Sequence, residues 1–175
     1  MATKKTAPFT LTERLTLASG ADTTVSGTID LGSYVDVGDR QAIEIHSVDY
    51  IFQGASAALH INASLPNNGS LLTQITDLNR GGMVFANDRA LVSSSSLHLD
   101  ANGGQSNVAD LFPDAFGKGS LEGRYVVNDS LYINVQADGT MAAASNVTVR
   151  VTASIVTLSQ KDFMAIAIQS TAADN

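Results

Sequence analysis

The sequence predicts an all-β domain, built as an antiparallel sandwich or barrel. Apolar and polar residues alternate with a period of two in several separate segments, which is the pattern of a strand with one buried face. Turns rich in Gly, Asn and Asp separate these segments, and helical spacing is confined to a short stretch near the C-terminus. A chain of 175 residues is long enough to bury a core in one domain without disulfides.

The first third of the chain contains three strand candidates. Residues 9–17 and residues 24–31 each place apolar side chains on alternate positions, so each predicts a strand with one face in the core. Residues 42–52 predict a longer strand that is apolar on both faces, with Ile43 and Ile45 on one side and Val48 on the other. Such a strand needs cover on both faces, from the opposite sheet and from a neighbouring element.

The middle of the chain is less regular. Residues 59–65 alternate and end at a Pro-Asn-Asn-Gly turn, which predicts another strand. Residues 71–78 fit either a strand or a short helix. Residues 110–123 contain one proline and three glycines and predict a loop, which Phe112 and Phe116 hold against the core.

The last third predicts two strands and a C-terminal element. Residues 125–135 alternate around a turn, and residues 147–155 form the most regular strand pattern in the chain. Ser159 and Asp162 have the spacing of a helix capping box, which predicts a short helix over Gln160–Gln169. The alternative for this segment is a final strand, because residues 165–168 also alternate in size and apolar character.

These patterns divide the chain into an N-terminal arm of residues 1–8, a sandwich domain of residues 9–170 and a C-terminal tail of residues 171–175. The arm has no apolar period and carries Lys4 and Lys5. It is interpreted either as a flexible, frayed terminus or as an arm that docks on a neighbouring subunit or an acidic surface.

The composition excludes several functions. The chain has no Cys, which excludes disulfides, thiolate metal sites and Cys nucleophiles. Its formal net charge is −7, and direct nucleic-acid binding is not expected because neutralising phosphates requires clustered Lys and Arg. No apolar run approaches the ~20 residues that span a bilayer, and residues 1–8 do not resemble a signal peptide.

No group of residues converges on a catalytic, cofactor or metal site, so we expect neither an enzyme nor a cofactor. His46, His60 and His98 lie in separate strand candidates and lack the close spacing of zinc ligands. Residues 100–103 resemble the start of a calcium loop, but Leu111 stands where an acidic ligand is needed.

The tyrosines are the remaining candidates for ligand binding, because the chain has no Trp. A flat aromatic ring can cover the apolar face of a sugar. The side chains concerned are Tyr34, Tyr50, Tyr125 and Tyr132. Each is interpreted either as such a platform or as a residue of the core or its rim.

A family resemblance lies in Thr24–Asp36 and Arg40–Ile45, which together show a strand, an Asp-Leu turn and a second strand. In this segment, about a fifth of the chain, the sequence resembles the single jelly-roll capsid proteins of tailless icosahedral viruses. The resemblance implies a single jelly roll of about eight strands in two packed sheets. It also implies copies packed side by side in a closed shell, as trimers or larger rings, with arms that reach under a neighbour or toward the inner face.

On this basis we expect a structural virion protein, a capsid subunit that assembles with copies of itself through lateral contacts. Other virion proteins are expected as further partners. The residues predicted to lie at the subunit interface are Lys4, Lys5, Phe9, Phe112, Phe116 and Phe163. The alternative function is a decoration, adhesion or carbohydrate-binding sandwich module.

Overall fold

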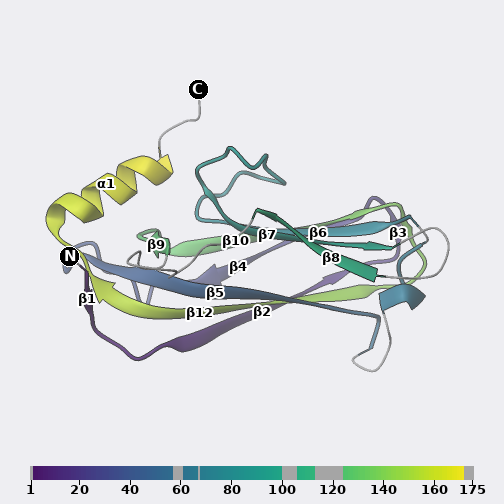
Figure 1. Ribbon diagram of the computed structural model, residues 1–175, viewed down its shortest axis with the longest axis horizontal. Helices are drawn as coiled ribbons and strands as arrows, with labels where there is room; N and C mark the ends of the chain where they lie inside the picture. The colour runs from purple at the N-terminus through teal and green to yellow at the C-terminus, as the bar shows by residue number, and fades with distance from the viewer. Residues whose placement is uncertain (1, 57–60, 67, 100–105, 113–123, 172–175) are drawn as a thin grey trace.

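A computed structural model describes residues 2–56, 61–66, 68–99, 106–112 and 124–171 (Figure 1). Two antiparallel five-stranded sheets pack face to face. The first sheet contains β1 (Thr3–Lys4), β2 (Phe9–Leu17), β5 (Gln41–Gln53), β9 (Arg124–Val126) and β12 (Ser145–Thr157). The second sheet contains β4 (Thr24–Asp30), β6 (Ser70–Thr76), β7 (Leu91–Leu99), β8 (Ser106–Phe112) and β10 (Ser130–Asp138). The small elements are β3 (Gly20–Ala21), which pairs with β11 (Thr140–Met141), the 3₁₀ turn η1 (Ile61–Ala63) and the helix α1 (Gln160–Thr171).

The order of strands in space differs from their order in the sequence. The first long strand, β2, pairs with the last strand, β12, and β12 pairs in turn with β5, which pairs with β9. In the second sheet, β4 lies beside β10, followed by β6, β7 and β8. The first long strand pairs with the last, and the chain crosses between the sheets at every long connection except those joining β6, β7 and β8, which is the arrangement of a jelly roll. The fold is a jelly roll, as predicted.

A β-bulge changes which residues of β5 face the core. The register between β5 and β12 shifts at Thr152/Ala153, where His46 is the extra residue on β5. Ile43 and Ile45 on one side of the bulge, and Val48 on the other, therefore all pack in the same core. The prediction that they lie on opposite faces is wrong, because a bulge reverses the alternation and leaves no signature in the sequence here.

Two predictions for the middle of the chain are also wrong. Ile61–Ala63 forms a 3₁₀ turn instead of a strand, and the Leu65 N–H donates to the Ile61 carbonyl at 3.0 Å. Ile61 and Leu65 are both buried. Residues four positions apart lie on the same face of a helical turn and on the same face of a strand, so this spacing is compatible with either structure. β8 extends to Phe112, so the loop predicted for residues 110–123 begins as a strand. Residues 71–78, for which a strand and a short helix were both open, form the strand β6 as far as Thr76.

The C-terminal segment is a helix, which confirms the first of its two predicted forms. Ser159 is its N-cap, because the Ser159 Oγ accepts a hydrogen bond from the Asp162 N–H at 3.2 Å and donates to the Asp162 carboxylate at 2.7 Å. That hydrogen bond lowers the pKa of Asp162. Phe163 is 6% exposed and packs with Ala42 and Val156, so α1 is fixed on the outer face of the first sheet.

Part of the predicted N-terminal arm lies along the same end of the sandwich. Thr3 and Lys4 pair with Thr157 and Val156 of β12. The Lys5 N–H then donates to the Ile155 carbonyl at 2.8 Å, so these residues contact their own subunit. No helix within the described ranges is long and apolar enough to cross a bilayer.

Candidate interaction surfaces

Residues 77–90, the β6–β7 loop, turn back over the outer face of the second sheet. Gln74 on β6 and Asn134 on β10 are cross-strand partners whose sequence neighbours Ile75 and Ile133 lie in the core, so both polar side chains point outward. The Gln74 carboxamide donates to the Val84 carbonyl and accepts from the Val84 N–H, each at 2.8 Å. Asn134 donates to the Gly82 carbonyl at 3.1 Å. The middle of the loop is therefore anchored to two strands.

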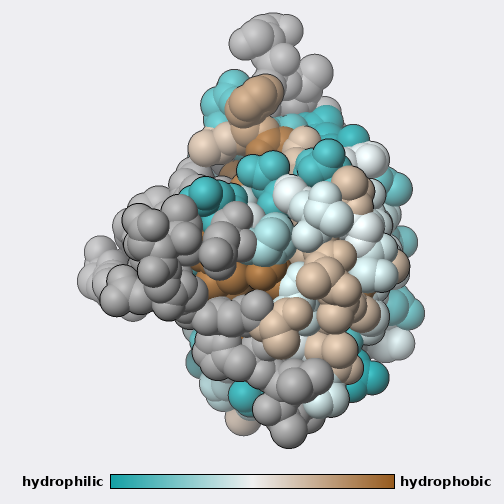
Figure 2. All heavy atoms as spheres, turned by 90° about the vertical axis from the view of Figure 1, so that its right-hand side faces the viewer, coloured by the Kyte–Doolittle hydropathy of each residue, from teal (hydrophilic) through white to brown (hydrophobic). Residues whose placement is uncertain are grey.

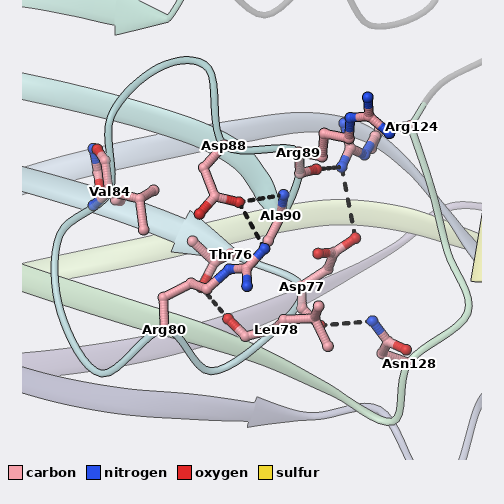
Figure 3. Close-up of polar contacts among 11 residues, drawn as sticks. Thr76, Asp77, Leu78, Arg80, Val84, Asp88, Arg89, Ala90, Arg124 and Asn128 are labelled. Carbon is pink, nitrogen blue, oxygen red and sulfur yellow. Dashed lines mark hydrogen bonds and ion pairs between the residues drawn. The ribbon is translucent and has the colours of Figure 1, made fainter. Parts of the chain in front are cut away.

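Further bonds fix the shape of the loop itself (Figure 3). The Arg80 guanidinium pairs with the Asp88 carboxylate at 3.0 Å, across the loop. The same Asp88 oxygen accepts the Ala90 N–H at 2.8 Å. Because a charged pair and a backbone group share one oxygen, the two limbs of the loop are held at a set distance.

Asp77 lies at the base of the loop and is almost completely buried, at 2% exposed. Its Oδ2 is 3.6 Å from the Arg124 guanidinium, and its carbonyl accepts a hydrogen bond from Asn128 at 2.7 Å (Figure 3). Burial raises the pKa of the Asp77 carboxyl, and the Arg124 charge opposes that rise without cancelling it. The ion pair with Arg124 joins the base of the loop to β9, while the Asp77 Oδ1 is buried without a hydrogen-bond partner among the described residues.

Phe85 stands at the tip of this anchored loop with 87% of its surface exposed. Its neighbour Val84 is bonded to Gln74, and its own carbonyl accepts the Asp88 N–H at 3.0 Å. Scattered exposed apolar residues are common, but this ring is presented to solvent by a backbone that is fixed on both sides. Aromatic side chains held in this way are the usual anchors of protein–protein contacts.

A groove of about 380 Å³ forms the second surface, between the β4–β5 connection and α1. It is lined on one side by Val37 and Arg40 and on the other by Phe163 and Met164. Val37 is 69% exposed and Met164 is 54% exposed. Ile168, one helical turn beyond Met164, is 61% exposed, so the apolar surface continues along α1.

The predicted interface residues fall at several places. Lys4 and Lys5 lie along β12, as described above. Phe9 stacks on Tyr34 with ring centroids 5.2 Å apart, and Phe163 forms the buried wall of the groove. Phe112 is the last residue of β8, and Phe116 lies outside the described residues. Sequence reasoning missed Phe85, whose only signal was a short apolar run after two glycines and before two polar turn residues.

The described histidines do not meet. His46 lies on β5 in the first sheet, with its Nε2 2.8 Å from the Ser154 Oγ. His98 lies on β7 in the second sheet, with its Nε2 2.8 Å from the Ser96 Oγ. His60 and residues 100–103 of the calcium-like segment are outside the described ranges. In the part of the chain that the structure describes, no three His, Asp or Glu side chains are grouped closely enough to hold a metal ion.

Figure 2 shows the end of the sandwich opposite α1, where an apolar area lies beside hydrophilic residues above it and pale residues to its right. No protein-family model matches the sequence, and no curated protein matches it. Among solved structures, VP1 of Trichodysplasia spinulosa-associated polyomavirus, in complex with sialylated precision glycooligomers, is similar with a TM-score of 0.39 and 9% identity. The match covers 89% of this chain and 98% of that chain. The fold described above follows from the strand order and does not depend on this likeness.

Proposed function

We propose that the protein is a structural virion protein, a capsid subunit that assembles with copies of itself through lateral contacts. The jelly-roll strand order and the resemblance of residues 24–36 and 40–45 to capsid proteins support this proposal. The observation that carries it is the presence of an exposed phenyl ring on an anchored loop and an open apolar groove elsewhere on the same subunit. Other virion proteins are expected as further partners.

The contact we propose places Phe85 of one subunit in the groove of the next, against Val37 and Met164. A volume of about 380 Å³ is in the range that accepts whole small ligands, so one phenyl ring fits. The loop and the groove are different surfaces, so the contact is heterologous and generates a ring when its rotation closes, while a shell needs a second kind of contact between rings.

Charge favours the same pairing. The β6–β7 loop carries two arginines and one accessible aspartate, since Asp77 is buried. The chain beside the groove, in residues 36–40 and 161–162, carries three aspartates against one arginine and one lysine. The weakly positive loop therefore meets a weakly negative rim, which steers the encounter and disfavours loop-to-loop contacts.

A weak contact is sufficient for this function. Burying one Phe contributes about 1.5–3 kcal/mol, which alone does not give a stable dimer. In a closed assembly each subunit makes the contact twice, once with its loop and once with its groove. Ring closure therefore multiplies the effective affinity without new contacts.

Light scattering coupled to size exclusion, followed by negative-stain microscopy, tests the proposal. The wild-type chain is expected to form rings or shells as its concentration rises, and Phe85→Ser is expected to remain smaller at the same concentration. Asn87→Ala is the matched control, because Asn87 is exposed on the same loop and forms no side-chain bond within the described residues. A wild-type protein that remains monomeric at high concentration would contradict assembly and favour the adhesion or carbohydrate-binding alternative.

A further inference from the structure

A second pocket, of about 290 Å³, lies on the outer face of the second sheet, where the β6–β7 loop folds over β4 and β10. Its floor comes from Thr28 and Ser26 on β4 and from Tyr132 and Asn134 on β10. Asn79 and Gly81 of the loop form its wall. Thr28 and Tyr132 are cross-strand partners, as are Ser26 and Asn134, so two adjacent pairs make up one continuous polar surface.

Hydrogen bonds hold the wall of this pocket in place without a ligand. Asn134 accepts a bond from the Ser26 hydroxyl at 2.7 Å and donates to the Gly82 carbonyl at 3.1 Å. Asn79 Oδ1 accepts the Gly81 N–H at 2.9 Å, which shapes the turn beside it. A ligand that enters the pocket therefore meets a preformed surface and does not need to order the loop.

Several polar groups in the pocket are left unused. The Tyr132 and Thr28 hydroxyls and the Asn79 amide nitrogen have no hydrogen-bond partner among the described residues. Each hydroxyl can both donate and accept, and the amide nitrogen can donate twice. They lie beside the ring of Tyr132, which is half-buried and points outward from a central strand. The pocket thus combines one flat apolar surface with several unpaired hydroxyl and amide groups.

The pocket carries no charge. None of its lining residues is an Asp, Glu, His, Lys or Arg. Arg80 stands between two lining residues, but its guanidinium is paired with Asp88 at 3.0 Å. A ligand with a full charge would therefore lose its hydration without gaining a partner of opposite sign.

We propose that this pocket binds a neutral sugar in its pyranose form. The apolar C–H face of the sugar covers the Tyr132 ring, and its hydroxyls exchange hydrogen bonds with Thr28, Asn79 and the Tyr132 hydroxyl. Tyr132 is one of the four tyrosines that the sequence offers as a platform. Tyr34 stacks on Phe9, and Tyr50 donates to the Ser93 hydroxyl at 2.7 Å, so these two have structural contacts instead. The pocket shares the β6–β7 loop with the proposed Phe85 contact, but neither Phe85 nor a residue of the groove lines it.

Saturation-transfer NMR with methyl glucoside, methyl galactoside and methyl glucuronide tests this site, since the method detects ligands of monomers and large particles alike. At least one neutral glycoside is expected to bind saturably and more strongly than the glucuronide. Tyr132→Leu should abolish the signal, while Tyr132→Phe and Thr28→Val, which keep the shape of the pocket, should each weaken binding several-fold. Thr12→Val, which removes an exposed hydroxyl from β2 of the other sheet, is the control and should bind as the wild type does.

Circular dichroism and the unfolding midpoint of each variant establish that it is folded before binding is compared. The proposal is overturned if no neutral glycoside gives a saturable signal, or if the glucuronide binds more strongly than both neutral glycosides. It is equally overturned if binding is unchanged in folded Tyr132→Phe and Thr28→Val.

Discussion

The proposed contact predicts that Phe85 and Met164 are energetically coupled although they lie on different surfaces of one subunit. We expect Phe85→Ser and Met164→Ser each to weaken self-association. Phe85 is 87% exposed in the subunit, so nearly its whole side chain is available for burial in the contact. Full burial of a Phe contributes about 1.5–3 kcal/mol, which corresponds to about a 10- to 150-fold loss of association constant for Phe85→Ser.

Sedimentation equilibrium on the two single variants and the double variant measures the coupling. Because both residues belong to the same contact, the double variant is expected to lose less than the sum of the two single losses. Ile51→Ser serves as the control, since Ile51 is 37% exposed on β5 and belongs to neither surface. Urea unfolding should show little change in either single variant, because exposed side chains contribute little to folding stability.

Two results would refute this reasoning. If the two losses simply add, Phe85 and Met164 do not meet across subunits. If Phe85→Ser assembles as the wild type does, the exposed ring is not an anchor, and the interface must lie elsewhere on the sandwich.

Three further predictions concern stability and the loop. Gln74→Ala should speed hydrogen exchange of the Val84 amide about tenfold or more, because two bonds to the loop are lost, and should weaken self-association without unfolding the sandwich. Burial raises the folded-state pKa of Asp77 above 3.8, so its contribution to stability is complete below pH 3.8 and is lost as pH rises through the folded pKa. Urea titrations from acid to neutral pH should therefore show the wild type losing stability relative to Asp77→Asn, and a trend of opposite sign would mean that pairing with Arg124 outweighs burial. Gly27→Ala should cost about 1–3 kcal/mol in unfolding free energy, because the added Cβ would lie 2.5 Å from the Leu15 Cδ2, and an unchanged midpoint would show that Leu15 moves aside freely.

The sequence by itself determined several strands that have one buried face, among them β2, β4 and β12, but the same alternation in Ile61–Leu65 gave a wrong prediction. Side chains of a strand alternate by local geometry, so residues 147–155 predict β12 without knowledge of its partners. The N-cap of α1 was also readable, because Ser159 and Asp162 act within a single turn. The composition likewise established a Cys-free chain with few charged residues and a formal net charge of −7.

Tertiary structure alone decided how those segments meet. The bulge at His46, the position of the β6–β7 loop over β10 and the exposure of Phe85 all depend on partners far away in the sequence. The bond from Asn134 to the Gly82 carbonyl joins residues 52 positions apart, and no local pattern encodes it. An apolar run such as residues 83–86 has the same sequence whether it is buried or presented to solvent, because burial is a property of what packs against it.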